Sequence, residues 1–332
     1  MRGEIGIGRW FRAVLCVALA AGSCTPRGNR VVVGSKNFTE QDILGEIIAQ
    51  QLERRTSLTV DRRLHLGGTF VCHQALVAGQ IDVYPEYTGT ALVAILRDPP
   101  DADPRTAFDR VSREYAARFH ARWLPPFGFD NTFAIVVRAS DASRLGLRTI
   151  SDAARVAPGW RAGFGYEFMD RADGYPGLAE RYGLHFAVAA RVMDLGLTYR
   201  ALADSVVDLI AGNSTDGQIE ELHLVALADD RRYFPAYEAA PVVGEAALRR
   251  HPEIATALAE LAGRISDTAM RRLNFLVDVR HRSAADVARE YLAGIGPGAG
   301  PLPGAAPAAY HSPSPTSPES AVPRRAQREA TP

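Results

Sequence analysis

Lysine is almost absent from this chain, since Lys36 is the single lysine among 38 lysine and arginine side chains. A guanidinium suits flat, bidentate contacts, whereas an ammonium is a compact point charge on a flexible stem. Composition alone leaves two explanations open. Lys36 is either an ordinary surface residue of an arginine-rich sequence, or it stands where a point charge is needed.

A charge excess of one sign and long apolar runs are missing as well. The formal net charge is zero and no basic stripe emerges along the sequence, which argues against a nucleic-acid surface. No apolar run reaches the ~18 residues that a membrane-spanning helix needs. A chain of 332 residues is more than one compact core usually fills, so we expect two lobes.

Cysteine is scarce, with Cys16, Cys24 and Cys72 the three in the chain. The first two fall in an N-terminal leader, which leaves Cys72 alone and excludes an internal disulfide in the mature domain. Cys72 precedes His73, but adjacent helix residues point in different directions, so a small core thiol is the expected role. Because the sequence has no metal-spaced His/Cys cluster and no nucleophile motif, we predict no metal, no cofactor and no enzyme activity.

Residues 1–24 have the features of a secretory signal peptide. Three arginines precede a short apolar run at residues 13–21, which has the length of a signal-peptide core rather than of a membrane span. The Ala-Gly-Ser-Cys sequence that follows resembles a lipoprotein signal site. It predicts lipidation at Cys24, with simple cleavage of the leader as the alternative.

The stretch around Lys36 predicts a strand, a tight polar turn and a helix. An apolar run at residues 31–33 ends at Gly34, and Thr39 with Asp42 marks a helix start. The helix would bury one apolar stripe, made of Ile43, Leu44, Ile47, Ile48 and Leu52. Helix starts at the carboxyl ends of strands favour anions, so Lys36 would lie where a carboxylate can be held.

The next part of the chain repeats this pattern. The sequence LGGT predicts a turn and a helix start, and residues 81–84 predict a strand that PEYTGT closes. We therefore expect the ring of Tyr87 and the hydroxyl of Thr90 at a second carboxyl-terminal strand edge. That edge would face the turn that holds Lys36.

Three motifs, SKNFTEQ, LGGT and YPEYTGTA, resemble those of the substrate-binding proteins of osmoprotectant ABC transporters, which capture glycine betaine, carnitine, choline or proline betaine. Weaker matches at GFDNTFAIVVR, YEFMDRADG, LTYRAL, STDG and RRLNFLVDV extend the resemblance over residues 31–294. It implies an α/β chain with the two-lobed periplasmic-binding-protein type II fold, a two-strand hinge and a central ligand cleft.

Two polar crossings between the lobes are expected, at residues 128–131 and 213–217. Two connections make a hinge whose motion closes the cleft. The chain ends in a segment dense in Pro, Ala, Ser and Gly, which predicts disorder. The predicted parts are lobe one at 31–129 plus 218–294, lobe two at 130–217 and a disordered tail at 295–332.

The resemblance also implies aromatic cage positions in lobe two. Phe133 matches a cage ring that is usually Tyr, and Tyr199 matches a further ring. Asn213 stands where many relatives have another Tyr, and Asn131 would offer its backbone carbonyl. Without the motifs, a tyrosine such as Tyr199 or Tyr87 would be taken as a half-buried core residue.

Glu167 and Arg171 match a family pair in which the arginine meets the ligand carboxylate and the acid orients the arginine. Their spacing of four also fits an ordinary helix ion pair. With Lys36 and Thr90 on the other side of the cleft, Arg171 would complete a clamp of charge-assisted hydrogen bonds.

A cage of ring faces suits a quaternary ammonium, which donates no hydrogen bond and is cheap to desolvate. We therefore predict an extracytoplasmic, lipid-anchored and monomeric receptor that binds a small quaternary-ammonium osmoprotectant, resembling glycine betaine or choline, and delivers it to an ABC permease. The alternative is the same receptor role for another amine zwitterion, ergothioneine-like or amino-acid-like. An enzyme on the same scaffold is the third and weakest hypothesis.

Overall fold

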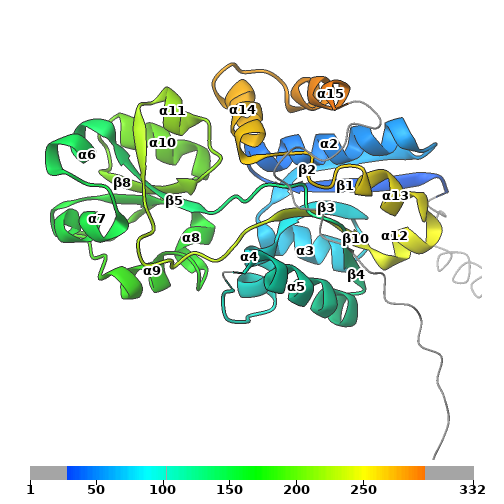
Figure 1. Cartoon of the computed structure of the whole chain (residues 1–332), viewed down its shortest axis with the longest axis horizontal. Coiled ribbons are helices and arrows are strands. Elements are labelled where there is room, and N and C mark those ends of the chain that lie inside the picture. Colours follow the sequence, from blue (N-terminus) through cyan, green and yellow to red (C-terminus); the bar gives the residue numbers. More distant parts are fainter. Residues whose placement is uncertain (1–27, 102, 296–332) are drawn as a thin grey trace, which may run out of the picture.

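The structure is a computed structural model that describes residues 28–101 and 103–295. The predicted signal peptide with Cys24, and the predicted tail from residue 296 onward, lie outside the described residues. Figure 1 shows two lobes joined by two extended segments. Each lobe has a five-stranded sheet covered by helices, which confirms the predicted two-lobed α/β fold. Within the described part of the chain, no helix has both the length and the apolar character needed to cross a membrane.

Lobe one is built on a sheet with the strand order β2-β1-β3-β10-β4. Its strands are β1 (Arg30–Lys36), β2 (Thr59–Gly67), β3 (Val83–Tyr87), β4 (Ala121–Trp123) and β10 (Ala239–Gly244). Strand β1 pairs in parallel with β2 and β3, whereas β10 runs antiparallel between β3 and β4. Because parallel strands end at the same sheet edge, β1 and β3 bring Lys36 and Tyr87 together as predicted.

Helices cover both faces of this sheet. They are α2 (Thr39–Arg55), α3 (Thr69–Val77), α4 (Thr88–Thr90), the π-helical η1 (Ala91–Ile95), α5 (Pro104–Phe119), α12 (Glu245–Arg250), α13 (Glu253–Ala259), α14 (Asp267–Asp278) and α15 (Ala284–Gly294). The predicted stripe of α2 is fully buried in one core, against α13, α14 and α15. Cys72 is a residue of α3 and lies in the second core, which α3 and α5 share, and burial there raises the pKa of its thiol to about 12. The predicted core thiol is thus confirmed.

Lobe two repeats the arrangement with the strand order β7-β6-β8-β5-β9. Its strands are β5 (Phe133–Arg138), β6 (Ala162–Phe164), β7 (Arg191–Val192), β8 (Leu209–Asn213) and β9 (Leu224–Leu227). Its helices are α6 (Ala139–Leu145), α7 (Ile150–Val156), the 3-10 helix η2 (Ala157–Gly159), α8 (Tyr166–Asp170), α9 (Tyr175–Tyr182), α10 (Leu195–Ala203) and α11 (Gln218–Glu221). Here β6 is parallel to β7 and β8, and β5 is antiparallel to β8 and β9.

The two crossings lie side by side between the lobes. The first joins β4 to β5 and the second joins β9 to β10, and an antiparallel bridge pairs Asp130 with Glu238. The backbone N–H of Tyr237 donates to Asp130 Oδ2 at 2.8 Å, and that of Asn131 donates to the carbonyl of Tyr237 at 3.2 Å. The connection is therefore a paired two-stranded hinge.

The predicted position of the second crossing, at residues 213–217, is wrong. The chain stays in lobe two through α11 and β9, because the apolar strand Leu224–Leu227 pairs with β5 at the sheet edge. Lobe two therefore extends past the predicted boundary at 217, and the return to lobe one follows Leu227. The polar residues 213–217 instead form a turn after β8 that packs on α14, where a Cβ on Gly217 would lie 2.6 Å from the backbone of Phe275.

Candidate ligand-binding site

A cavity of about 210 Å³ lies between the lobes. Its walls come from the carboxyl ends of β1 and β3 in lobe one and of β6 and β8 in lobe two, where ligands bind in open α/β sheets. The residues that line it are Lys36, Asn37, Phe38, Gly68, Tyr87, Thr90, Asn131, Phe133, Gly165, Tyr166, Glu167, Phe168, Arg171, Asp194, Leu195, Ala211, Asn213 and Tyr237. Every predicted binding residue except Tyr199 is among them.

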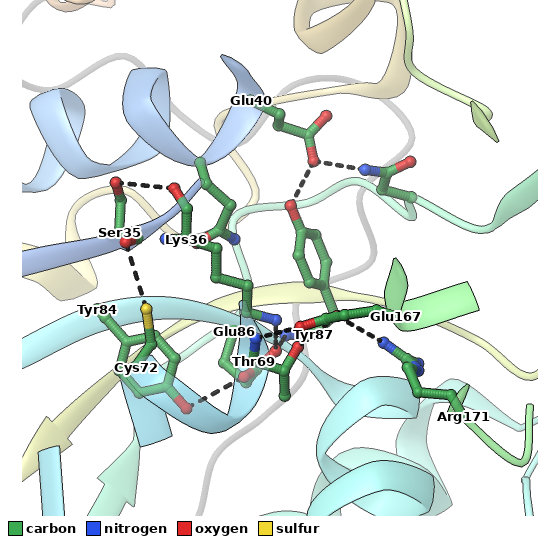
Figure 2. Close-up of polar contacts among 12 residues, drawn as sticks. Ser35, Lys36, Glu40, Thr69, Cys72, Tyr84, Glu86, Tyr87, Glu167 and Arg171 are labelled. Atoms are coloured by element: carbon green, nitrogen blue, oxygen red, sulfur yellow. Dashed lines mark hydrogen bonds and ion pairs between the residues drawn. The ribbon is translucent and has the colours of Figure 1, made fainter. Parts of the chain in front are cut away.

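Lys36 ends β1 with its ammonium held inside lobe one. Its Nζ lies 2.5 Å from Glu86 Oε1, and the side chain of Glu86 is 0% exposed. Glu86 also accepts hydrogen bonds from the Tyr84 hydroxyl at 3.1 Å and the Tyr87 N–H at 2.7 Å. Figure 2 shows the ammonium directed at this carboxylate. Because an ammonium has three donors, Glu86 fixes its direction without using all of them.

The motifs did not mark Glu86 as a functional residue. The signal was available, since Glu86 is a charged side chain inside an apolar central strand, and a buried charge requires a partner. The only lysine of the chain is that partner. The lone Lys36 is therefore a buried, positioned charge rather than an ordinary surface residue.

Tyr87 ends β3 with its ring in the cavity wall. Lys36 Nζ lies 5.0 Å from the ring centroid, and Phe38 stacks on Tyr87 with centroids 6.4 Å apart. The Tyr87 hydroxyl donates to Glu40 Oε1 at 2.7 Å (Figure 2). Burial, and then the negative charge of Glu40, raise the pKa of Tyr87 well above its ordinary value, so the hydroxyl stays a donor and the ring orientation is fixed.

Arg171 follows α8 and is fixed by a partner that the motifs did not identify. Its Nε and Nη2 lie 2.9 and 2.5 Å from the two carboxylate oxygens of Asp173. The Tyr237 hydroxyl also donates to Asp173, at 2.7 Å. The guanidinium carbon lies 5.2 Å from the ring centroid of Phe133 and 6.0 Å from that of Tyr237. Two cavity rings therefore pack on a paired cation.

Glu167 forms an ion pair with Arg171, as the resemblance implied, but no hydrogen bond. Its Oε2 lies 3.7 Å from Arg171 Nη1, beyond hydrogen-bond distance. Its hydrogen bonds go to lobe one, where it accepts the N–H of Thr69 at the start of α3 and the Thr69 hydroxyl at 3.0 Å. A Cβ on Gly68 would lie 2.1 Å from Glu167 Oε1, so the glycine makes room for the carboxylate. The contact joins the two lobes at the cavity, as Figure 2 shows.

Tyr199 does not line the cavity, contrary to the prediction. It lies on the face of α10 that packs on the lobe-two sheet and is 2% exposed. Its hydroxyl donates to Asp216 Oδ2 at 2.6 Å. The same oxygen accepts the N–H of Asn213 at 2.9 Å. Asn213 lies at the cavity end of β8, so Tyr199 supports that end from behind.

Phe38, Tyr237, Tyr166 and Asp194 line the cavity without having been predicted. Phe38 lies inside the SKNFTEQ motif two residues after Lys36, and this nearness could have identified it. Tyr237 had no such signal, because it belongs to the second crossing, whose position the sequence did not show.

The charges around the cavity do not cancel. Lys36 and Arg171 are already paired with Glu86 and Asp173. Two further carboxylates, Glu167 and Asp194, line the cavity. The walls therefore combine aromatic faces with an excess of negative charge, which favours a cationic group.

The chain is similar to known proteins over both lobes. A family model described as the substrate binding domain of the ABC-type glycine betaine transport system matches residues 29–294. A carnitine transport binding protein of Listeria monocytogenes is 34% identical over 287 residues, which cover 84% of this chain and 93% of that protein. An ergothioneine transport permease/ergothioneine binding protein of Helicobacter pylori is 33% identical over 267 residues, which cover 80% of this chain and 48% of that protein.

A solved structure agrees with these matches. The crystal structure of a glycine betaine/carnitine/choline ABC transporter protein superimposes with a TM-score of 0.67 at 32% identity, covering 80% of this chain and 98% of that one.

Proposed function

The chain belongs to the family of substrate-binding domains of ABC-type glycine betaine transport systems, and from this premise we propose that it binds a small quaternary-ammonium osmoprotectant, similar to glycine betaine or choline, and delivers it to an ABC permease. It acts outside the cytoplasm, as a monomer, and catalyses no reaction.

One observation supports the ligand class above the others: aromatic side chains line the cavity, and the carboxylates in and directly behind its walls outnumber the two cations. Tyr87, Phe133 and Tyr237 present rings there, and Glu167 and Asp194 add negative charge. A quaternary ammonium cannot donate a hydrogen bond, and each cation–π contact contributes about 0.5–2 kcal/mol. Several rings together supply much of a micromolar affinity.

A ligand carboxylate would be held at the Lys36 and Arg171 side of the cavity. Glu86 takes one donor of Lys36, and Asp173 takes Nε and Nη2 of Arg171. The remaining donors of Lys36, Nη1 of Arg171 and the Thr90 hydroxyl can bind the carboxylate. We therefore propose that their partners orient these cations for a zwitterion.

Thermal-shift measurements on the purified protein test the ligand class. A ligand that binds the native state must raise the melting temperature, so the panel includes glycine betaine, choline, carnitine, ergothioneine and amino acids. We expect at least one quaternary-ammonium compound to stabilise the protein, and amino acids without a methylated nitrogen to have no effect. Stabilisation by amino acids alone would refute the proposal.

A second candidate is a receptor for a bulkier amine zwitterion of the ergothioneine type. Asn213 supports it, because an amide lines the cavity where the resemblance leads us to expect a ring. The similarity to the Helicobacter protein is a second reason to include ergothioneine. A larger shift with ergothioneine than with glycine betaine, carnitine or choline would favour this candidate.

We further propose that the protein is anchored to the membrane by lipid at Cys24. The support is the Ala-Gly-Ser-Cys sequence at residues 21–24. Cys24→Ser should release the protein from the membrane fraction without changing ligand binding. If the variant stays with membranes as the parent does, the anchor does not depend on Cys24.

A further inference from the structure

Glu40, in the first turn of α2, is a buried carboxylate that does not line the cavity. It is 1% exposed, and no cationic side chain in residues 28–101 or 103–295 forms an ion pair with it. Burial raises the pKa of Glu40, and hydrogen bonds only partly oppose this. A carboxylate in such a place needs all its acceptor positions filled.

Four side chains from different parts of the fold fill them. Glu40 Oε1 accepts the Tyr87 hydroxyl and Asn131 Nδ2, both at 2.7 Å. Glu40 Oε2 accepts the Thr215 hydroxyl at 2.5 Å and Asn274 Nδ2 at 3.1 Å. One carboxylate thus joins a cavity ring, the first crossing, α14 of lobe one and the turn after β8 of lobe two.

The turn of lobe two is docked firmly at this point. Asn274 Nδ2 also donates to the carbonyl of Thr215 at 2.9 Å, and Arg271 Nε donates to the carbonyl of Ser214 at 3.0 Å. Gly217 approaches the backbone of Phe275. The same turn begins at Asn213, which lines the cavity, so docking of the turn also places a cavity residue.

We propose that Glu40 is a positioning residue that couples closure of the lobes to the orientation of the Tyr87 ring. With lobe two docked, the carboxylate is dry and its hydrogen bond to Tyr87 is strong. When the lobes open, the hydrogen bond from Thr215 to Glu40 breaks and water reaches the carboxylate. This water weakens the hydrogen bond between Tyr87 and Glu40. Because coupling is reciprocal, a ligand that fixes the Tyr87 ring also favours the closed lobes. This inference rests on the proposed function.

The test removes the two hydroxyls that donate to Glu40 from Thr215 and Tyr87, first separately and then together. Thr215→Val deletes a hydroxyl and keeps the shape, and Tyr87→Phe deletes a hydroxyl and keeps the ring. Calorimetry gives the ligand affinity of the parent, both variants and the double variant. X-ray scattering gives the radius of gyration without ligand.

We expect Thr215→Val to lower the affinity for the ligand by about tenfold and to increase the radius of gyration of the ligand-free protein. Thr215→Ser, which keeps the hydroxyl, should restore both. Thr198→Val is the matched control, since it removes a buried hydroxyl that bonds within α10 of the same lobe, and it should behave like the parent.

The double variant distinguishes coupling from two independent losses. If Glu40 links the two sites, the affinity of the double variant departs from the product of the single losses by at least about threefold. Independent losses that multiply would overturn the inference, as would a Thr215→Val protein that closes like the parent. If no quaternary ammonium binds the parent, the proposed function fails, and the same four proteins compared by radius of gyration alone still decide the coupling.

Discussion

The two walls of the cavity are built in different ways. In lobe one, Lys36 and Tyr87 are buried, and buried carboxylates of the same lobe, Glu86 and Glu40, hold them. In lobe two, Arg171 is held in the same way by Asp173, but the side chain of Glu167 is 36% exposed and reaches over to lobe one, and Asn213 is half-buried. Lobe one thus offers a preorganised wall, which reduces the entropy lost on binding. We propose that lobe two is the wall in which sequence changes alter ligand choice.

The largest effect is expected from breaking the preorganised wall. Glu86→Gln would leave the Lys36 ammonium buried without its charge partner, which costs about 3–5 kcal/mol of folding free energy. Denaturant unfolding measures this loss of folding free energy. The matched control is Glu53→Gln, which loses a partly exposed ion pair with Arg62 and should cost under about 1 kcal/mol. Equal losses would show that Lys36 is not held as described.

A pH effect should arise where lobe two docks on lobe one. Burial raises the pKa of Asp216 from 3.8 to about 7, with Glu40 and Asp278 adding repulsion. The folded protein then holds a proton that the unfolded chain releases, so this stabilisation is complete below about pH 4 and is lost as the pH rises through about 7.

Asp216→Asn tests this, because the amide oxygen can still accept the bonds from Tyr199 and Asn213. Between pH 5 and pH 8, the unfolding free energy of the parent should fall by on the order of 1–4 kcal/mol more than that of the variant. The comparison needs denaturant titrations at both pH values. Identical pH dependence in the two proteins would mean that Asp216 titrates normally.

Asn213 lines the cavity at a position where the resemblance leads us to expect a further ring. Asn213→Tyr would add a ring face and should tighten glycine betaine several-fold, by about 0.5–2 kcal/mol. Asn213→Leu adds bulk without a ring face and should bring no gain. Calorimetry measures the betaine affinity of the three proteins. Weaker betaine binding in the tyrosine variant would show that position 213 does not belong to the cage.

The smallest effect concerns the choice between a zwitterion and a cation. Glu167→Gln keeps an acceptor for Thr69 but removes a negative charge near Arg171. The affinity for glycine betaine should rise relative to that for choline by a few-fold, on the order of the 0.2–1 kcal/mol of a partly exposed ion pair. A ratio that is unchanged, or that moves toward choline, would show that Glu167 does not influence the carboxylate end.

Lobe one was the more predictable half. Its wall comes from contiguous motifs in which a strand, a turn and a helix start follow one another, so Lys36, Tyr87 and Thr90 could be placed at one sheet edge. Their buried partners are farther away in sequence, and contacts such as that between Lys36 and Glu86 depend on strand pairing.

Lobe two could be predicted only in part. The face of a helix that meets a sheet is decided by packing, which turned Tyr199 away from the cavity and into the core. The polar turn at residues 213–217 has the composition of a crossing, but its backbone carbonyls accept hydrogen bonds from side chains of α14 in the other lobe. Tyr237 was missed because the true second crossing follows β9.

The central claim is that the cavity recognises a quaternary nitrogen by its charge as well as its shape. Calorimetry with choline and with its neutral isostere, in which carbon replaces the nitrogen, tests this directly. The account predicts that choline binds and that the isostere binds at least about tenfold more weakly, since it loses the cation–π contacts and the attraction of the surplus carboxylates. Equal affinities for the two would contradict it.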